Sequence, residues 1–313
     1  MYKIGWLVND CLSCIPEAKI ITFWNKLLEW FPDLIDKTNG YTDFSILASK
    51  IENELIQYEK PYYIIRNGTY FRKINTNIKQ ISLIQDIHSN DLLNQQIDVI
   101  NNSHAVVFNT NYVYNKYKYH INNNILVKIC PLGVDFEFFK PIQQRHPDVL
   151  PNSILFIGDS NNYPKGFNIL LDIIHKMTDQ NFCLIMKDNF SLENLDPNIR
   201  DRVCIFNRIN QHAVHVIINS CILALCTSHE ETQHLSGIEC AACNIPIVSR
   251  EIGIYYDNKE DPRWGCVADE SNFVEKINDV LKNIHIYKPR ECFIEKYSLD
   301  ICKNNWIQII NDL

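Results

Sequence analysis

Residues 222–249, ILALCTSHEETQHLSGIECAACNIPIVS, constrain the fold more than any other part of the chain. The apolar run over residues 222–226 is followed at once by polar side chains, which is typical of a buried strand that ends where a site can open. The stretch from residue 232 can be helical until Asn244 and Pro246, because Asn tolerates the left-handed conformation that ends helices and Pro cannot continue one. A second apolar run closes the segment. The pattern therefore predicts a strand, a helix and a second strand.

The rest of the chain alternates β-rich runs with helical patterns. The β-rich runs are residues 3–8, 62–66, 81–85, 105–109, 154–158, 182–186, 203–206, 222–226 and 247–249. The helical patterns cover residues 18–31, 90–102, 168–177 and 211–220. Such alternation predicts parallel sheets covered by helices.

The predicted fold class is α/β, with two Rossmann-like, doubly wound domains that face a cleft. A stretch of Pro, polar and charged residues at 141–151 is typical of a linker. We therefore expect one domain over residues 1–145 and a second over residues 146–313. The last helix, about residues 291–313, is expected to pack back on the first domain.

Composition narrows the function classes. The chain has 313 residues, 46% hydrophobic and 21% charged, which suits a globular protein of two domains. A formal net charge of −7 without a Lys/Arg-rich run argues against a nucleic-acid partner. The frequent use of Asn, Ile and Lys is typical of AT-rich genomes, such as those of protists and large DNA viruses.

The sequence predicts a cytoplasmic protein, because it contains neither a signal peptide nor a run of ~18 apolar residues. Peripheral contact with a membrane through the helical pattern at residues 18–31 stays open, although this pattern lacks a basic face. The twelve Cys are expected to be reduced thiols in that compartment. The pairs Cys11/Cys14 and Cys240/Cys243 are too far apart for a zinc ribbon, so we expect no metal site.

Two glutamates indicate the chemistry of the site. Glu231 and Glu239 are separated by seven residues, an offset of roughly 12 Å along a helix. This distance is about the span from a ribose diol across a diphosphate to a hexose. One carboxylate could accept hydrogen bonds from a sugar and the other from a ribose, with the free N–H groups of the helix start between them for the phosphates. The pair alone is weak evidence, and its place between a strand and a small-residue helix strengthens it.

The segment resembles the retaining nucleotide-sugar glycosyltransferases of family four, in which Glu, seven residues and Glu-Ala precede a Gly-x-Pro turn. Three further stretches are similar to that family. They are PLGVDFEFFKP at residues 131–141, ILFIG at residues 154–158 with the following Pro164-Lys165-Gly166, and residues 289–306. The resemblance covers most of residues 100–313 and implies the two-domain GT-B fold.

The resemblance implies transfer of a hexose or pentose from a nucleoside-diphosphate sugar to a carbohydrate or lipid-linked acceptor. The reaction would retain the anomeric configuration and need neither a bound metal nor a further cofactor. His88 and Glu231 would act on the transferred sugar. The expected donor-binding residues are Lys165, Lys187, Arg208, Thr232, Gln233, His234, Leu235 and Glu239.

Three positions depart from the family pattern. Asp159 follows Gly158 where relatives carry an Arg that helps to hold the diphosphate, and His234 stands where they often have Gly. Asn244 replaces the Gly of the turn, a change that its conformational tolerance makes harmless. Two alternatives stay open: a nucleotide-sugar epimerase or hydrolase of the same fold, and a non-catalytic relative that binds sugar nucleotides. A dinucleotide-dependent oxidoreductase is disfavoured, since no Gly-x-Gly-x-x-Gly follows the first β-rich run.

Overall fold

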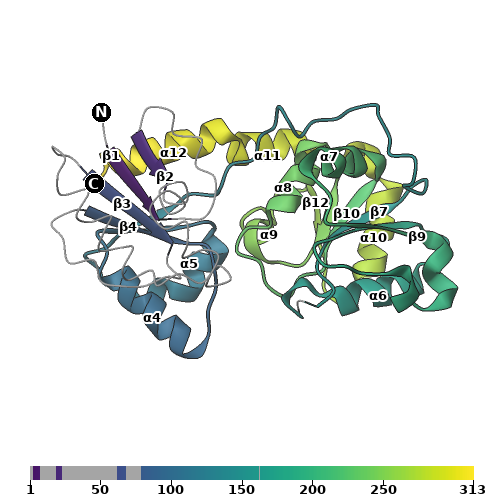
Figure 1. Cartoon of the computed structure of the whole chain (residues 1–313), viewed down its shortest axis with the longest axis horizontal. Helices are drawn as coiled ribbons and strands as arrows, with labels where there is room; N and C mark the ends of the chain where they lie inside the picture. The colour runs from purple at the N-terminus through teal and green to yellow at the C-terminus, as the bar shows by residue number, and fades with distance from the viewer. Residues whose placement is uncertain (1–2, 8–18, 23–61, 68–78, 162) are drawn as a thin grey trace, which may run out of the picture. The chain divides into compact units, whose positions relative to one another are not determined.

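The chain folds into two compact units, each built on a parallel sheet. The computed structural model describes residues 3–7, 19–22, 62–67, 79–161 and 163–313. Unit 1 comprises residues 1–131 and 302–313, and unit 2 comprises residues 132–301. Each unit contains a six-stranded sheet in which every described strand pair is parallel (Figure 1). The predicted α/β class with two Rossmann-like sheets is confirmed.

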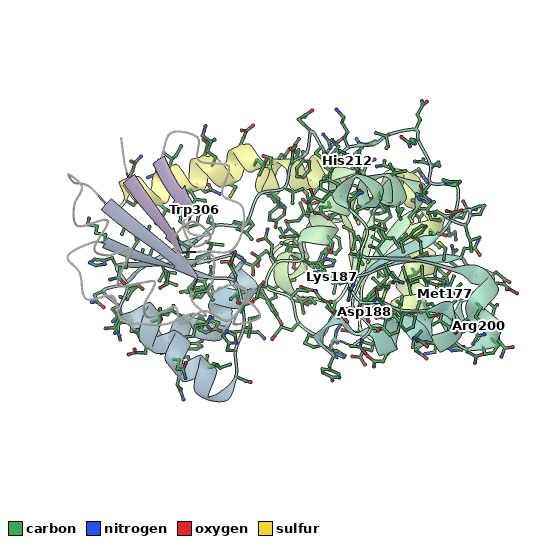
Figure 2. The ribbon with its side chains drawn as sticks, in the orientation of Figure 1. Met177, Lys187, Asp188, Arg200, His212 and Trp306 are labelled. Atoms are coloured by element: carbon green, nitrogen blue, oxygen red, sulfur yellow. The ribbon has the colours of Figure 1, made fainter. Side chains whose placement is uncertain are left out.

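The sheet of unit 1 has the strand order β2-β1-β3-β4-β5-β6. Its strands are β1 (Lys3–Leu7), β2 (Lys19–Thr22), β3 (Tyr62–Asn67), β4 (Lys79–Ile84), β5 (Ala105–Phe108) and β6 (Leu126–Ile129). The described helices are α4 (Asn90–Asn101), α5 (Asn111–Tyr117), the 3-10 turn η1 (Lys118–His120) and the end of α12 (Leu299–Asn311). Side chains of α4, α5, β4 and β5 form one buried cluster. Trp306 of α12 is fully buried in the same unit (Figure 2).

Strand β2 corrects one prediction. Residues 18–31 have a helical apolar stripe, but residues 19–22 form a strand that pairs in parallel with β1. The β-branched side chains of Ile20, Ile21 and Thr22 lose rotamer freedom in a helix and suit a pleated surface. The remainder of that expected helix lies outside the described residues, as do Cys11 and Cys14. Strand β6 and strand β12 (Gly265–Val267) were also not predicted.

The sheet of unit 2 has the strand order β12-β11-β10-β7-β8-β9. Its other strands are β7 (Ile154–Gly158), β8 (Phe182–Met186), β9 (Val203–Asn207), β10 (Leu223–Cys226) and β11 (Ile247–Ser249). Its α-helices are α6 (Phe167–Lys176), α7 (Gln211–Ser220), α8 (Leu235–Ala242), α9 (Gly253–Asp257), α10 (Phe273–Lys282), α11 (Pro289–Tyr297) and the start of α12. The 3-10 turns are η2 (Tyr163–Lys165), η3 (Leu192–Asn194), η4 (Pro197–Arg202) and η5 (Ile284–Ile286). No helix in the described parts of the chain is long and apolar enough to cross a lipid bilayer.

Helices cover both faces of this sheet (Figure 1). Apolar side chains of α6 and α10 join those of β7, β8 and β10 in one buried core. Helix α8 packs on β10 and β11 and also contacts α11. The strands are buried on both sides, which explains why they read as continuous apolar runs in the sequence.

Strands β7 and β10 are neighbours at the point where the strand order of unit 2 reverses. The chain runs from β7 to β8 on one side, and from β10 to β11 on the other. Open α/β sheets bind ligands outside the carboxyl ends of the strands at such a point. Here Asp159 follows β7 and Thr227 follows β10. The topology therefore identifies these two loops as the candidate site.

The segment before β7 packs on unit 2. The carbonyl oxygens of Phe136 and Phe139 accept hydrogen bonds from Arg290 at 2.9 and 3.0 Å, and Asn219 Oδ1 accepts one from the Ile142 amide at 3.0 Å. The division between the units falls between Pro131 and Leu132, whereas the sequence places the domain boundary at residue 145. These polar contacts fasten the expected linker to the second unit, which is why it groups with that unit.

Candidate active site

Two loops at the strand-order reversal are tied together by backbone contacts. The amide of His229, after β10, donates to the carbonyl oxygen of Pro164 at 2.7 Å, and the Thr227 hydroxyl donates to the carbonyl oxygen of Lys165 at 3.2 Å. Gly166 has a φ of 63°, and a Cβ at this position would lie 2.1 Å from the Thr227 oxygen. Only glycine allows this close approach. The loop carrying Lys165 is thereby held against the loop carrying Glu231.

Glu231 lies in a network of three polar side chains. One carboxylate oxygen, Oε1, is 2.6 Å from the ammonium of Lys165 and accepts a hydrogen bond of 2.8 Å from the Ser228 hydroxyl. The side chains of Lys165 and Glu231 are only 22% and 11% exposed. Lys165 and Glu231 are both predicted site residues, and the structure brings them into direct contact.

The pKa of Glu231 lies below its ordinary value. Burial by itself raises this pKa, but the His234 ring, the Lys165 ammonium and the Ser228 hydroxyl lower it by more. Burial lowers the pKa of His234 to about 4, an effect that the positive charges of Lys165 and Lys187 reinforce and that Glu231 opposes. Because His234 is then neutral at pH 7, Lys165 supplies the lasting positive charge beside Glu231. The carboxylate is ionised before any ligand arrives.

Helix α8 begins at Leu235, three residues later than predicted. Its N-cap is His234, which has a left-handed φ of 76°. This is the position at which relatives often have Gly, whose lack of a Cβ suits such a conformation. Glu231 therefore lies in the turn before the helix, and the estimate of 12 Å along a helix does not apply to it. The predicted end of the helix is confirmed, since Asn244 has a φ of 62°.

Both nitrogens of His234 have protein partners. Nδ1 lies 2.6 Å from the hydroxyl of Tyr255, and Nε2 lies 3.1 Å from the hydroxyl of Ser236. A Cβ on Gly237 would stand 2.0 Å from the Tyr255 hydroxyl oxygen and 2.5 Å from Nδ1. Glycine at position 237 thus makes room for the contact that stabilises the unusual cap. The side chain of His234 belongs to the framework of the turn.

Glu239 has a different environment within α8. Burial raises the pKa of its carboxyl to about 7, and the charge of Lys187 offsets only part of this effect. No described residue forms a hydrogen bond or an ion pair with the carboxylate. The side chain is only partly buried, so its carboxylate oxygens stay accessible to hydroxyl groups of a ligand.

The other predicted donor-binding residues occupy several places in unit 2. Lys187, which Figure 2 labels, follows β8, and Arg208 follows β9. Arg208 Nε donates to the carbonyl oxygen of Lys187 at 3.3 Å. Thr232 lies in the turn before α8, and Leu235 is exposed at the first position of the helix. The buried side chain of Gln233 bonds to the amide and the carbonyl of Leu132 at 2.9 and 2.7 Å, so it fastens the segment before β7.

Asp159 holds the conformation of its own loop. One carboxylate oxygen accepts a hydrogen bond from the Asn161 amide at 2.9 Å. Asp188, which follows Lys187, accepts hydrogen bonds from the Ser160 amide and hydroxyl and from the Asn161 side chain. Two carboxylates therefore shape the loop in which the resemblance led us to expect a phosphate-binding Arg.

His88 lies in unit 1, in the loop after β4, as predicted. Its amide donates to the hydroxyl of Tyr117 at 3.3 Å, and Tyr117 in turn bonds to Gln96 at 2.5 Å. The Nε2 atom of His88 is buried and has no hydrogen-bond partner among the described residues. A ring nitrogen in this state is available for a ligand.

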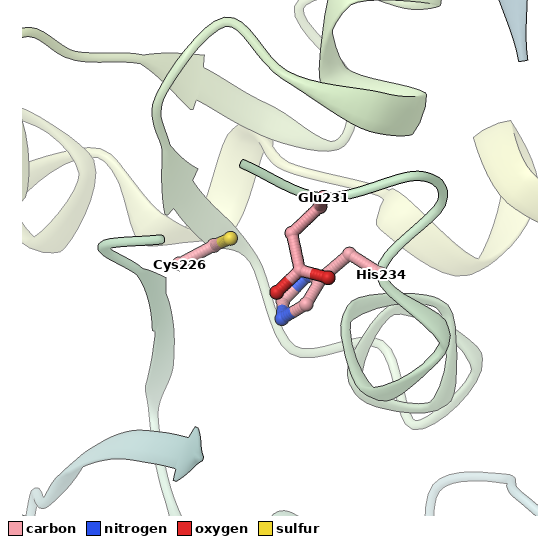
Figure 3. Close-up of side chains that lie close together, drawn as sticks. All are labelled: Cys226, Glu231 and His234. Carbon is pink, nitrogen blue, oxygen red and sulfur yellow. The ribbon is translucent and has the colours of Figure 1, made fainter. Parts of the chain in front are cut away.

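Three side chains could together hold a metal ion. Single ligand atoms of Cys226, Glu231 and His234 lie within 4.8 Å of one another (Figure 3). Burial, with the nearby charge of Glu231, raises the pKa of the Cys226 thiol to about 12. Metal binding would therefore require the Cys226 thiol to lose a tightly held proton and a His234 nitrogen to leave its hydroxyl partner. The donor set fits a metal poorly in the observed arrangement, and metal independence stays a prediction.

Sequence reasoning missed Ser228, His229 and Tyr255, which make close contacts in the turn. Their residue types are common in loops and helices, and nothing local indicates that they meet. Gly237 is the one sequence signal near them, since it marks a close approach inside a helix.

Comparisons with known proteins give a family match over part of the chain. Residues 151–283 match the protein family described as "Glycosyl transferases group 1". No curated protein sequence matches the chain.

Solved structures are similar over the whole chain. HepE from Anabaena in complex with UDP-glucose is 14% identical, with a TM-score of 0.75 and 100% of both chains covered. Sucrose-phosphate synthase from Thermosynechococcus elongatus is also 14% identical, with a TM-score of 0.69, 100% of this chain and 88% of that chain covered. An α,α-trehalose 6-phosphate synthase from Burkholderia multivorans is 10% identical, with a TM-score of 0.64 and coverages of 86% and 74%. These likenesses show the GT-B fold, and with the family match over unit 2 they support a glycosyltransferase.

Proposed function

We propose that the protein transfers a hexose or pentose from a nucleoside-diphosphate sugar to a carbohydrate or lipid-linked acceptor, with retention of anomeric configuration. The observation that carries this proposal is the pair of unlike carboxylates around α8. Glu231 is ionised and paired with Lys165, whereas Glu239 is partly buried and unpaired among the described residues. The likeness to HepE in complex with UDP-glucose supports a nucleotide-sugar donor.

The proposed reaction separates charge. Breaking the bond between the anomeric carbon and the phosphate leaves positive charge on the sugar and negative charge on the departing diphosphate. An ammonium has three N–H donors, so Lys165 can keep its bond to Glu231 and still donate to a phosphate oxygen. Fixed cations and amides at the start of α8 stabilise the diphosphate without rearrangement.

Each carboxylate has its own part in the proposal. Glu231 accepts hydrogen bonds from the transferred sugar, and its negative charge favours the positive charge that develops there. Glu239 accepts hydrogen bonds from the ribose diol, whose hydroxyls satisfy the partly buried carboxylate. Lys187, Arg208 and the segment from Thr232 to Leu235 complete the donor site, and His88 keeps its proposed role toward the transferred sugar. The proposed reaction uses no metal.

We also propose a cytoplasmic location. The ten cysteines that the structure describes are all free. Several of them are buried in unit 2, where two Cys neighbours on adjacent strands, Cys183 and Cys204, stay unbridged. Reduced thiols are the norm in the cytosol.

Thermal unfolding in the presence of UDP-, GDP-, ADP- and dTDP-sugars tests the donor class. A ligand present at 100 times its dissociation constant adds about 2.7 kcal/mol to the free energy of unfolding, so a true donor gives a clear shift. Incubation of that donor with glycan and lipid-linked acceptors then shows transfer, and the anomeric coupling of the product shows its configuration. Absence of stabilisation by every nucleotide sugar would remove the proposal.

A further inference from the structure

The hydrogen-bonding state of the His229 ring follows from its contact with Arg250. Its Nδ1 lies 2.8 Å from Nη1 of Arg250, the residue that follows β11. A guanidinium has only N–H donors, so Nδ1 must be the acceptor. In the neutral imidazole the single ring hydrogen is therefore on Nε2. Arg250 fixes the tautomer of His229.

The Nε2–H group has no acceptor within the part of the chain that the structure describes. Nε2 is buried, and no described residue accepts a hydrogen bond from it. A buried donor without an acceptor is rare in proteins, because its lost contact with water is not replaced. This N–H donor therefore needs an oxygen acceptor, and the described part of the chain does not supply one.

The ring is also held in place on its other sides. It stacks on Tyr163 with a centroid separation of 4.6 Å and an angle of 9° between the planes. The backbone amide of His229 bonds to Pro164, and the next residues along the chain lead to Glu231. Tyr163 is 75% exposed and belongs to the same turn as Lys165. His229 is therefore a rigid donor in the same loop pair as the Lys165–Glu231 contact.

The positive charge of Arg250, which donates to the His229 ring, is balanced by Glu270. Nη1 of Arg250 is 3.0 Å from a carboxylate oxygen of Glu270, so the guanidinium is paired while it donates to His229. The same Glu270 oxygen is 3.8 Å from Nδ1. A neutral donor of this kind suits an oxygen of a sugar hydroxyl or of a phosphate.

We infer that His229 binds substrate, with Nε2–H donating a hydrogen bond to an oxygen of the nucleotide sugar. The inference rests on the proposed function, since it takes the substrate from it. It adds a specificity residue, because a substrate that lacks an oxygen at this position would leave the buried donor unpaired. The oxygen belongs to either the sugar or the diphosphate, and the two sources give different experimental results.

Replacement of His229 separates the hydrogen bond from the packing. His229→Phe keeps a ring for Tyr163 and removes Nε2–H, whereas His229→Gln supplies an amide donor in place of the imidazole. We expect His229→Phe to weaken binding about two- to tenfold and His229→Gln to recover part of this loss. His212→Phe is the matched control, because His212 also contacts an aromatic ring, that of Phe138, but lies on α7.

Calorimetry with two ligands identifies the source of the oxygen. The probes are the nucleotide sugar that stabilises the wild type best and its free nucleoside diphosphate. Loss of affinity for both in His229→Phe assigns the oxygen to the diphosphate, and loss for the nucleotide sugar alone assigns it to the sugar. Unchanged affinity for both, with unchanged turnover, would overturn the inference.

Nitrogen NMR of histidine-labelled protein tests the same inference without relying on a folded Phe variant. The spectrum of the free wild type should show the Nε2–H tautomer of His229, identified by its loss in His229→Gln, and the Nε2 resonance should shift when the nucleotide sugar binds. An Nδ1–H tautomer, or an Nε2 resonance that does not shift when the ligand binds, contradicts the inference. If no nucleotide sugar binds the wild type, the proposed function fails and the inference fails with it, whereas binding that is indifferent to His229 removes the inference alone.

Discussion

The pKa of a glutamate is lowered in the turn before α8 and raised within α8 itself. In the turn, Glu231 contacts Lys165 at 2.6 Å and Ser228 at 2.8 Å, and its pKa is below the ordinary value. In the helix, burial raises the pKa of Glu239 to about 7. Burial by itself therefore does not set the charge of a side chain, since it raises the pKa of both carboxyl groups. Nearby charges and hydrogen-bond donors decide it.

The two carboxyl groups are therefore suited to different roles. An ionised, fixed carboxylate can stabilise charge that develops during a reaction without rearrangement. A carboxyl that holds its proton in the free protein can gain its acceptor role when hydroxyl groups bind. Four predictions test these roles and the proposed independence from metal ions.

The largest effect is expected from Glu231→Gln. The variant keeps the shape of the side chain but loses the charge that we place beside the reacting sugar, so turnover should fall about 100-fold or more. Affinity for the free nucleoside diphosphate should change little, as calorimetry can measure. Glu230→Gln, the neighbouring carboxylate, is the control and should retain activity. A Glu231→Gln enzyme with normal turnover and lost diphosphate affinity would show that the two glutamates exchange roles.

Glu239→Gln should stabilise the free protein at pH 8. The folded-state pKa of about 7 lies above the ordinary pKa of 4.5 for a glutamate, so the folded state binds more protons than the unfolded state between these pH values. Stability therefore falls as pH rises through this window, by about 3 kcal/mol in total. Denaturant unfolding of wild type and variant at pH 4.5 and pH 8 measures the difference. Equal pH dependence of the two proteins would mean that Glu239 is ionised in the free protein.

Glu239→Ala should weaken binding of the nucleoside diphosphate by about 10- to 150-fold, since a hydrogen bond to a charged group contributes roughly 1.5–3 kcal/mol. The wild type should also lose affinity as pH falls through about 7, because the carboxyl is then protonated before the ligand binds. Calorimetric titrations at several pH values test both points. Identical affinities of wild type and Glu239→Ala would remove Glu239 from the ribose.

The smallest effect, none, is expected when a chelator is added. Lys165 and the start of α8 are the proposed partners of the diphosphate, so activity should survive EDTA. Complete loss that Mg²⁺ or Mn²⁺ restores would contradict this. Loss of the metal response in Asp159→Ala would then identify a ligand, and loss in Cys226→Ser would point instead to the cluster of Cys226, Glu231 and His234.

Much of unit 2 could be predicted from the sequence. The apolar runs of β7, β8 and β10 and the helix at Gln211–Ser220 lie where periodicity placed them, because a strand buried on both faces admits only apolar side chains. The start of α8 could not be predicted, since it depends on His234 in a left-handed conformation that Tyr255 and Gly237 stabilise from elsewhere. Strand β2 was misjudged for a similar reason: pairing with β1 overrides a helical stripe.

The α/β class, the two sheets and the placement of Glu231, Glu239 and Lys165 in α8 or in the loops beside it can be read from the sequence. The ionisation and pairing of these side chains depend on the tertiary fold. Lys165 and Glu231 are far apart in the chain and meet because Gly166 lets one loop rest on the other. Glu239 is separated from Glu231 by seven residues, yet it has no such partner among the described residues and its pKa moves the other way. Periodicity in the sequence indicates which faces of an element are buried. The charge of a side chain depends on its distances to other side chains, and folding sets these distances.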